Sequence, residues 1–325
     1  MNQRTIFDRS YEQEFTWQSK HIKFFLELPN IGRATVEKII EVNPDINQWD
    51  REYVASQFSN FEKFIMLLPE EIPKLQNLDE TIVMNYRENR FPKSLKNMNK
   101  DKPLLLWFKG NPEIPEGVAV VGSRKIIPET TEVINNFIKH LCDLHVCIVS
   151  GLAKGVDELA HFAALENNLK TIAVLPSSLD NILPKSNTNL AYEIVENGGL
   201  IVTEYGPDSP RKPENSHYIS RNRIQAGLSD LVFIAQSSIP GGTMTTGKFA
   251  LDYKKKLSVY KSSTNLDIEE YKGNRYLLQN IDENFDFSVL KFTNNQIDLF
   301  KEKESLADFS IPEDLEEIKN SLIKE

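Results

Sequence analysis

The sequence predicts an α/β protein, an extended Rossmann-like, doubly wound parallel sheet with a small helical domain in front of it. Two observations predict this class. From Val118 onward, short apolar runs typical of buried strands alternate with amphipathic helical patterns, which indicates a parallel sheet covered by helices on both faces. Residues 1–80 show helical periodicity and no strand pattern, so we expect a separate helical domain there.

The helical domain contains a stretch, residues 28–40 (LPNIGRATVEKII), that resembles a helix-hairpin-helix. The turn of that motif can offer backbone amides to DNA phosphates. Asn30 stands where the motif usually has glycine, and asparagine tolerates the left-handed backbone conformation. DNA contact and a purely structural or partner-binding role are both open for this domain. The apolar positions around the turn are Leu26, Leu28, Ile31, Val36, Ile39 and Ile40.

A linker and the sheet follow in order along the chain. Residues 86–110 predict a linker and a strand at the sheet edge, because two prolines precede the apolar run 104–108. We assign residues 81–262 to the Rossmann-like core with this linker, and residues 263–325 to a core extension and an acidic C-terminal tail. The predicted core strands are GVAVVG, VCIVSG, TIAVLP, LIVTEY, DLVFIAQ and LSVY, and the helices between them are PETTEVINNFIKHL, KGVDELAHFAALEN, NTNLAYEIVENG, RNRIQAGL and TTGKFALDYKKK.

Composition is that of an ordinary globular protein, 40% hydrophobic and 26% charged, with a net charge of -9. The excess acid lies in the tail, since residues 263–325 hold 7 basic and 15 acidic residues, against 31 and 32 in residues 1–262. A local basic groove in the main body is compatible with this balance. The chain has no apolar run of 18 residues and a polar start, so we expect a cytoplasmic protein with no membrane contact.

The two cysteines, Cys142 and Cys147, lie between a helical pattern and an apolar strand. We expect them to be buried free thiols rather than ligands of a metal or partners in redox chemistry. The sequence offers no zinc-binding set and no disulfide framework. We expect no cofactor.

The turn after the first core strand reads Gly122-Ser123-Arg124. A dinucleotide-binding fold would have G-x-G-x-x-G here and an acidic residue at the end of the second strand, and the sequence has neither. The second strand ends instead in SGLAKG, and the fifth is followed by PGGTMTT. Turns of this kind present backbone N–H groups and a helix N-terminus to an anion, and Lys154 adds a point charge. Alternatively, the glycines only permit tight turns. The candidate anion-binding residues of the three turns are Gly122, Ser123, Arg124, Ser150, Gly151, Lys154, Gly155, Gly241, Gly242, Thr243 and Thr246.

Two arginines and an asparagine, Arg221-Asn222-Arg223, lie near the start of a predicted short helix in SRNRIQAGLSD. Arginines at such a position either solvate the surface or clamp a phosphate with two hydrogen bonds each. Beside three turns suited to anions, the clamp is the favoured interpretation.

Seven motifs and a lead-in segment together carry a family resemblance. GVAVVGSRK, VSGLAKGVDELAH, TIAVLPSSLDNILPKSN, GGLIVTEY, SRNRIQAGLSD, GGTMTTGKFAL and GNRYLLQN occur in that order, and with the YRENRFPKSL lead-in they span roughly residues 86–280. In this order they resemble the DNA-processing protein A (DprA, or Smf) family. The resemblance implies an extended Rossmann-like fold, binding of single-stranded DNA without sequence preference, a homodimer, and help in loading the RecA recombinase during natural transformation. It implies no catalysis. The DNA-binding residues it implies are Ser123, Arg124, Lys154, Arg221, Asn222 and Arg223, and its later turn matches Gly241, Gly242, Thr243 and Thr246.

Single-strand binding requires a positively charged groove and uses aromatic side chains on which bases stack. Because the groove contacts phosphates, binding should depend steeply on salt. Tyr205 and Tyr218 are candidates for stacking, with a packing role equally open.

Two other classes remain. A phosphoribohydrolase on the same sheet would need a carboxylate, but Lys248 occupies the position of its glutamate and Thr245 that of its third glycine. Asp157 and Glu158 could supply a carboxylate, but the helix dipole explains acids at this helix start without chemistry. For His161 a structural role is favoured over that of an acid or base. A sensor of free nucleotide fits the turns equally well. The length of the binding site separates these classes, because a strand binder gains affinity over several nucleotides.

Overall fold

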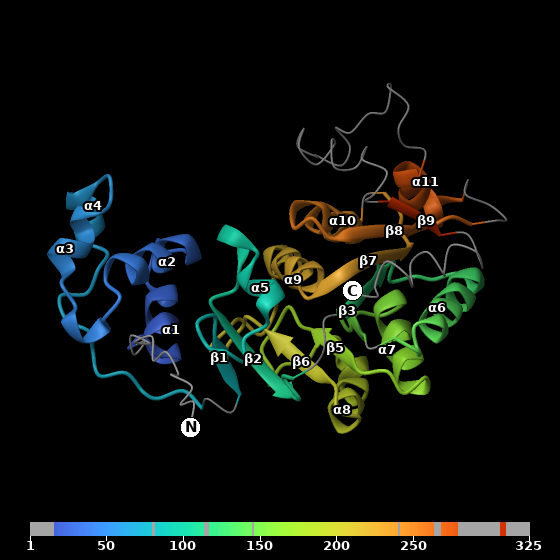
Figure 1. Ribbon diagram of the computed structural model, residues 1–325, viewed down its shortest axis with the longest axis horizontal. Helices are drawn as coiled ribbons and strands as arrows, with labels where there is room; N and C mark the ends of the chain where they lie inside the picture. The colour runs from blue at the N-terminus through green and yellow to red at the C-terminus, as the bar shows by residue number, and fades with distance from the viewer. Residues whose placement is uncertain are drawn as a thin grey trace, which may run out of the picture. The chain divides into compact units, whose positions relative to one another are not determined.

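The computed structural model describes residues 16–79, 82–113, 117–144, 146–239, 241–262, 268–278 and 306–309, the last of these as backbone. The chain divides into two compact units, Met1–Asn85 and Tyr86–Glu325 (Figure 1). Most of the predicted acidic tail lies outside the described residues.

The first unit is built from short helices around a small aromatic and aliphatic core. Trp17 and Phe25 are fully buried at its centre, with their ring centroids 5.2 Å apart. Asn30, in the turn between the first two helices, has a φ of 61°, which confirms the left-handed conformation predicted for it. The elements are α1 (Ser19–Glu27), α2 (Arg33–Val42), η1 (Ile46–Gln48), α3 (Arg51–Ser56), α4 (Phe61–Ile65) and β1 (Val83–Asn85).

The second unit contains a sheet of eight strands in its described part, in the order β2-β6-β5-β4-β3-β7-β8-β9. β2 pairs antiparallel with β6 at one edge, and the other pairs are parallel. The predicted fold class is confirmed. The strands are β2 (Leu105–Gly110), β3 (Gly117–Gly122), β4 (Cys147–Ser150), β5 (Thr171–Val174), β6 (Leu200–Thr203), β7 (Ser229–Gln236), β8 (Lys256–Tyr260) and β9 (Leu306–Phe309).

Helices cover both faces of this sheet (Figure 1). Alternate residues of β3 and β7, such as Val120 and Phe233, form one core with α6 and α7. Residues of the opposite parity, such as Ile234, face α10, where Gly247 lies against them. The helices are α5 (Lys93–Lys96), η2 (Asn99–Asp101), α6 (Pro128–His140), α7 (Val156–Glu166), η3 (Lys185–Asn187), α8 (Thr188–Glu196), α9 (Asn215–Gly227), α10 (Gly242–Asp252), η4 (Glu269–Tyr271) and α11 (Lys272–Leu278).

Two expectations were wrong. The helix carrying Arg221 and Arg223 is not short: α9 begins at Asn215, where the side chains of Glu214 and His217 form a capping box, so both arginines lie in its interior. Its first turns are polar and therefore show no apolar periodicity. Of the two cysteines only Cys147 is buried, in β4, whereas Cys142 is exposed in the turn that follows α6.

Candidate functional site

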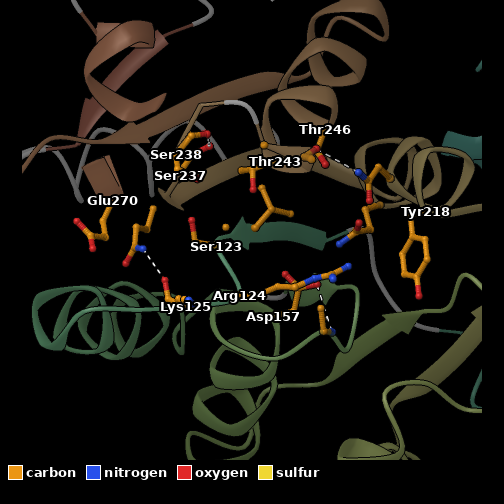
Figure 2. Close-up of a pocket in the computed structure, with 18 of the residues that line it drawn as sticks. Ser123, Arg124, Lys125, Asp157, Tyr218, Ser237, Ser238, Thr243, Thr246 and Glu270 are labelled. Carbon is orange, nitrogen blue, oxygen red and sulfur yellow. Dashed lines mark hydrogen bonds between the residues drawn. The ribbon is translucent and has the colours of Figure 1, made fainter. Parts of the chain in front are cut away.

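A cavity of about 480 Å³ opens at the carboxyl ends of β3 and β7 (Figure 2). The strand order switches here, because β4, which follows β3 in the chain, lies on one side of β3 and β7 lies on the other. Open α/β sheets bind ligands at such switch points. Nine of the predicted site residues line the cavity: Gly122, Ser123, Arg124, Arg221, Asn222, Gly241, Gly242, Thr243 and Thr246.

The turn after β3 is fixed by its neighbours. A Cβ on Gly122 would lie 2.5 Å from Cγ2 of Val156, so only glycine fits there. The amide of Ser123 donates to the carbonyl of Gln236 over 2.8 Å, and the Ser123 carbonyl accepts from the Val156 amide over 3.1 Å. The guanidinium of Arg124 lies 5.6 Å from the ring centroid of Tyr218, which also lines the cavity. This turn therefore presents a hydroxyl and a cation beside an aromatic ring.

The SGLAKG turn after β4 supports the cavity wall from behind, because its glycine makes room for Arg221. A Cβ on Gly151 would lie 1.3 Å from Nη1 of Arg221, so this glycine lets the arginine pass. Leu152 and Gly155 both have positive φ, 61° and 83°, and the leucine stores strain of a kind often found at functional sites. Ser150 donates its hydroxyl to the Val120 carbonyl over 2.7 Å. Lys154 is exposed and does not line the cavity.

Arg221 forms the inner wall of the cavity and is only 6% exposed. Its Nη1 lies 3.3 Å from the Val174 carbonyl and 3.6 Å from Oδ2 of Asp157. Burial raises the pKa of Asp157, and the guanidinium opposes that rise. Asp157 therefore holds the arginine, a role that the helix dipole alone did not predict.

Three buried donors on α9 have no hydrogen-bond partner among the described residues: Nε of Arg221, Nε of Arg223 and Nε2 of Gln225. The side chains of Arg221 and Gln225 line the cavity. An unsatisfied buried donor costs about 1–3 kcal/mol. The inner wall therefore favours a ligand rich in oxygen acceptors, such as phosphate.

Arg223 points elsewhere. Its side chain is 3% exposed and does not line the cavity. Nη2 lies 2.5 Å from Oε1 of Glu204, and Nη1 donates to the Ser220 carbonyl over 3.0 Å. The two arginines do not form a joint clamp in this structure. Asn222, between them, lines the cavity and donates to the Gly242 carbonyl over 3.2 Å.

The N-terminus of α10 closes the cavity opposite Arg124. Gly241 is the N-cap residue, and a Cβ there would lie 2.7 Å from the carbonyl oxygen of Ser238. Thr243, in the first turn of the helix, and Thr246, just after it, add hydroxyls (Figure 2). The free amides of this turn and the helix dipole attract an anion.

The cavity is not uniformly basic. Arg124, Lys125 and Arg221 line it, but so do Asp157, Glu269 and Glu270. Figure 2 shows Glu270 at the end away from Tyr218. Asp157 is paired with Arg221, so the exposed acids of the cavity are Glu269 and Glu270.

The remaining candidates lie outside the cavity. Tyr205 packs on His217, with ring centroids 4.6 Å apart. His161 is fully buried, its Nδ1 lies 2.7 Å from the Thr171 hydroxyl, and burial lowers its pKa to about 3, so it is a neutral packing residue. In the described part of the chain, no three His, Cys, Asp or Glu side chains gather as a metal site, and no helix is long and apolar enough to cross a membrane.

Of the lining residues on α9, Gln225 was not predicted from the sequence. Tyr218, Arg221, Asn222 and Gln225 are spaced i, i+3, i+4 and i+7, so they form one polar face of α9. Extending the helix back to Asn215 would have revealed this stripe. Gln236, whose Oε1 accepts from the Thr130 hydroxyl and the Ile127 amide, carries no signal in an apolar strand. The other lining residues that were missed are Val121, Lys125, Ala153, Ser237, Ser238, Glu269 and Glu270.

Comparison with known proteins gives a consistent result. The model of the DNA recombination-mediator protein A family matches residues 82–285. Protein Smf of Borreliella burgdorferi is 35% identical over 198 residues, which are 58% of this chain and 62% of that protein. The DNA processing protein DprA of Streptococcus pneumoniae is 40% identical over 154 residues, 47% of this chain and 53% of that protein. The chain thus spans less than two thirds of the length of these relatives.

Two solved structures share the fold. The X-ray structure of DprA from Streptococcus pneumoniae has a TM-score of 0.66 at 28% identity, covering 81% of this chain and 93% of that one. The structure of DNA processing protein A from Helicobacter pylori, a protein described with a single-stranded DNA binding mode, has a TM-score of 0.52 at 32% identity, covering 61% and 87%.

Proposed function

This chain belongs to the DNA recombination-mediator protein A family, and we propose that it binds single-stranded DNA without sequence preference at the cavity between β3, α9 and α10. The observation that carries the proposal is the meeting of the GSR turn, the inner wall of α9 and the N-terminus of α10 around one space. Each alone is a weak anion site, and together they provide amides, hydroxyls and two guanidinium groups.

A backbone phosphate sits between Arg124 and the first turn of α10. Ser123 and Thr243 supply hydrogen bonds to its oxygens, and Arg221 supplies charge from behind. A neighbouring base stacks on Tyr218, which the Arg124 guanidinium already approaches. None of these contacts reads a base edge, so binding tolerates any sequence.

The exposed acids at the other end of the cavity repel phosphate. Glu269 and Glu270 therefore direct the strand toward Arg124 and away from η4. Lys154, exposed next to the GSR turn, extends the basic path outside the cavity. This path requires a strand of several nucleotides rather than one.

The protein acts by binding and not by catalysis. The buried carboxylate in the cavity, Asp157, is paired with Arg221 and is not available as the base that glycosidic hydrolysis needs. The bound strand is protected and passed to a RecA-type recombinase by a homodimer in DNA processing and transformation. The family's description as a recombination mediator and the DNA-processing relatives support the role in DNA processing.

Fluorescence anisotropy with labelled oligo-dT of graded length tests the proposal, with a duplex and AMP as controls. Affinity should rise with strand length, fall steeply with salt and be unaffected by AMP. Affinity that is independent of length and lost on adding AMP would contradict it and indicate a nucleotide sensor or hydrolase. A search for released base would then separate those two.

A further inference from the structure

A short segment after β8 packs beneath the cavity. Residues 268–278, which form η4 and α11, begin the GNRYLLQN motif at Gly273. Tyr271 and Asn274 are fully buried. Figure 1 shows α11 beside β8, close to the end of β7. The proposed DNA contacts do not explain why this segment buries the polar side chain of Asn274.

Asn274 uses its whole side-chain amide on backbone. Its Oδ1 accepts from the Ser237 amide over 2.6 Å. Its Nδ2 lies 2.9 Å from the Tyr260 carbonyl and 3.3 Å from the carbonyls of Ile234 and Ala235. An amide NH₂ group donates and an amide oxygen accepts, so these partners fix its orientation. Asn274 thereby ties the ends of β7 and β8 to the first residue beyond β7.

Gly273 completes the hold on Ser237. The Gly273 amide donates to the Ser237 carbonyl over 2.7 Å, so both backbone groups of Ser237 are bonded to the segment. A Cβ on Gly273 would lie 2.7 Å from the Ser237 carbonyl oxygen. This spot therefore requires glycine, since the obstructing atom belongs to backbone.

Ser237 starts the wall of the cavity. Ser237 and Ser238 both line it, and the chain then runs to Gly241 and the N-terminus of α10 (Figure 2). The residue before them, Gln236, donates through Nε2 to the Lys125 carbonyl over 2.7 Å. The position of Ser237 is thus coupled to both anion-binding turns.

A second contact links the segment to the same glutamine. The Tyr271 hydroxyl lies 3.1 Å from the Thr130 hydroxyl, which donates to Oε1 of Gln236 over 2.6 Å. Burial raises the pKa of Tyr271 to about 12, so its hydroxyl stays protonated and able to donate. The segment therefore contacts the β7 end at two points.

We infer that Gly273 and Asn274 are positioning residues for the DNA site, which hold Ser237 so that the N-terminus of α10 faces Arg124. The inference rests on the proposed function. Neither residue touches the strand. They act through the backbone of Ser237, and the geometry of the anion site depends on them.

Three alanine variants provide the test. Asn274→Ala and Gly273→Ala should each weaken oligo-dT binding about tenfold or more, because the two halves of the anion site lose their alignment. Leu277→Ala is the matched control: it is a buried apolar residue of the same helix, and its truncation destabilises α11 while the hydrogen bonds of Gly273 and Asn274 to Ser237 are kept. Binding is measured well below each variant's melting temperature. Hydrogen exchange at the Ser237 amide should speed up in the Asn274 variant and not in the control.

Asn274→Asp adds a second test, the pH dependence of DNA affinity, which a loss of helix stability alone would not produce. A buried aspartate facing three carbonyls has a raised pKa, and its protonated form can again donate and accept. Relative to wild type at the same pH, the Asp variant should bind weakly at about pH 8 and recover at about pH 5.5, while the Ala variant stays weak at both.

The outcomes separate the two proposals. If wild type fails to bind oligo-dT, the proposed function is wrong and the inference has no basis. If wild type binds and Asn274→Ala, folded, binds equally well, only the inference is wrong. A loss of binding in Leu277→Ala as large as in Asn274→Ala, or no recovery of the Asp variant at low pH, also overturns the inference.

Discussion

Arg221 and Arg223 are two residues apart in one helix, both are buried, and both face a carboxylate, yet only Arg221 lines the cavity. Two residues along a helix turn the side chain by about 200°, so the pair points to opposite sides. Arg221 lies beside the cavity with its Nε unpaired, whereas Arg223, whose Nε is also unpaired among the described residues, bonds Glu204 and the Ser220 carbonyl away from the cavity. An arginine motif can thus be half ligand site and half scaffold.

The two ion pairs should respond differently to the loss of one partner. A buried ion pair adds little net stability, but removing one partner leaves an uncompensated charge. Around Arg223 that charge has no access to solvent or ligand. Around Arg221 the cavity and a bound phosphate can compensate. Breaking the Arg223–Glu204 pair should therefore lower the stability of the fold, and breaking the Arg221–Asp157 pair should weaken DNA binding.

The largest effect is expected at the scaffold pair. Glu204→Gln leaves the Arg223 guanidinium buried without its carboxylate and should lower the free energy of unfolding by about 3–5 kcal/mol. Urea denaturation measures it. At temperatures where the variant is folded, its affinity for oligo-dT should equal that of wild type. A stable variant with weakened binding would place Arg223 in the DNA site and end the contrast.

The next effect concerns Arg221 and needs no change of charge. Gly151→Ala puts a Cβ where Nη1 of Arg221 lies, so the guanidinium must move away from the cavity wall. Affinity for oligo-dT should fall by about 2–3 kcal/mol, the worth of a charge-assisted hydrogen bond. Asn189→Ala is the control, because Asn189 is exposed on α8 and does not line the cavity. Unchanged affinity in a folded Gly151 variant would remove Arg221 from the site.

The smallest of the three effects is the pH dependence of stability that arises from His161, whose pKa is lowered in part by Arg221. Burial, and then the charge of Arg221, lower the pKa of His161 from 6.5 to about 3. Between those values the unfolded chain binds a proton that the folded chain does not, so stability falls as pH drops from 6.5 toward 3, by about 1.4 kcal/mol per pH unit. Near pH 5 the loss is about 2 kcal/mol.

His161→Gln should remove this slope, and the exposed His140→Gln should keep it. Urea denaturation at a series of pH values gives the comparison. Parallel curves for wild type and His161→Gln would mean that His161 titrates normally in the fold.

Much of the fold was open to prediction from sequence, because apolar runs and glycine turns are local signals. Ser123, Arg124 and Gly241 were found in this way, since each follows a strand whose end is apparent. Asp157, Gln225 and Asn274 were not, because their roles depend on partners far away in the chain. Nor does the sequence tell Arg221 from Arg223, since the difference lies in what surrounds α9.

The central claim is that a strand phosphate binds beside Arg124, and the salt dependence of binding tests it most directly. The slope of log affinity against log salt counts the phosphates that the protein neutralises. Arg124→Gln should reduce that slope by about one, and Lys109→Gln, which removes an exposed charge from the strand that pairs with β6 at the other end of the sheet, should leave it unchanged. Equal slopes for Arg124→Gln and wild type would contradict the account.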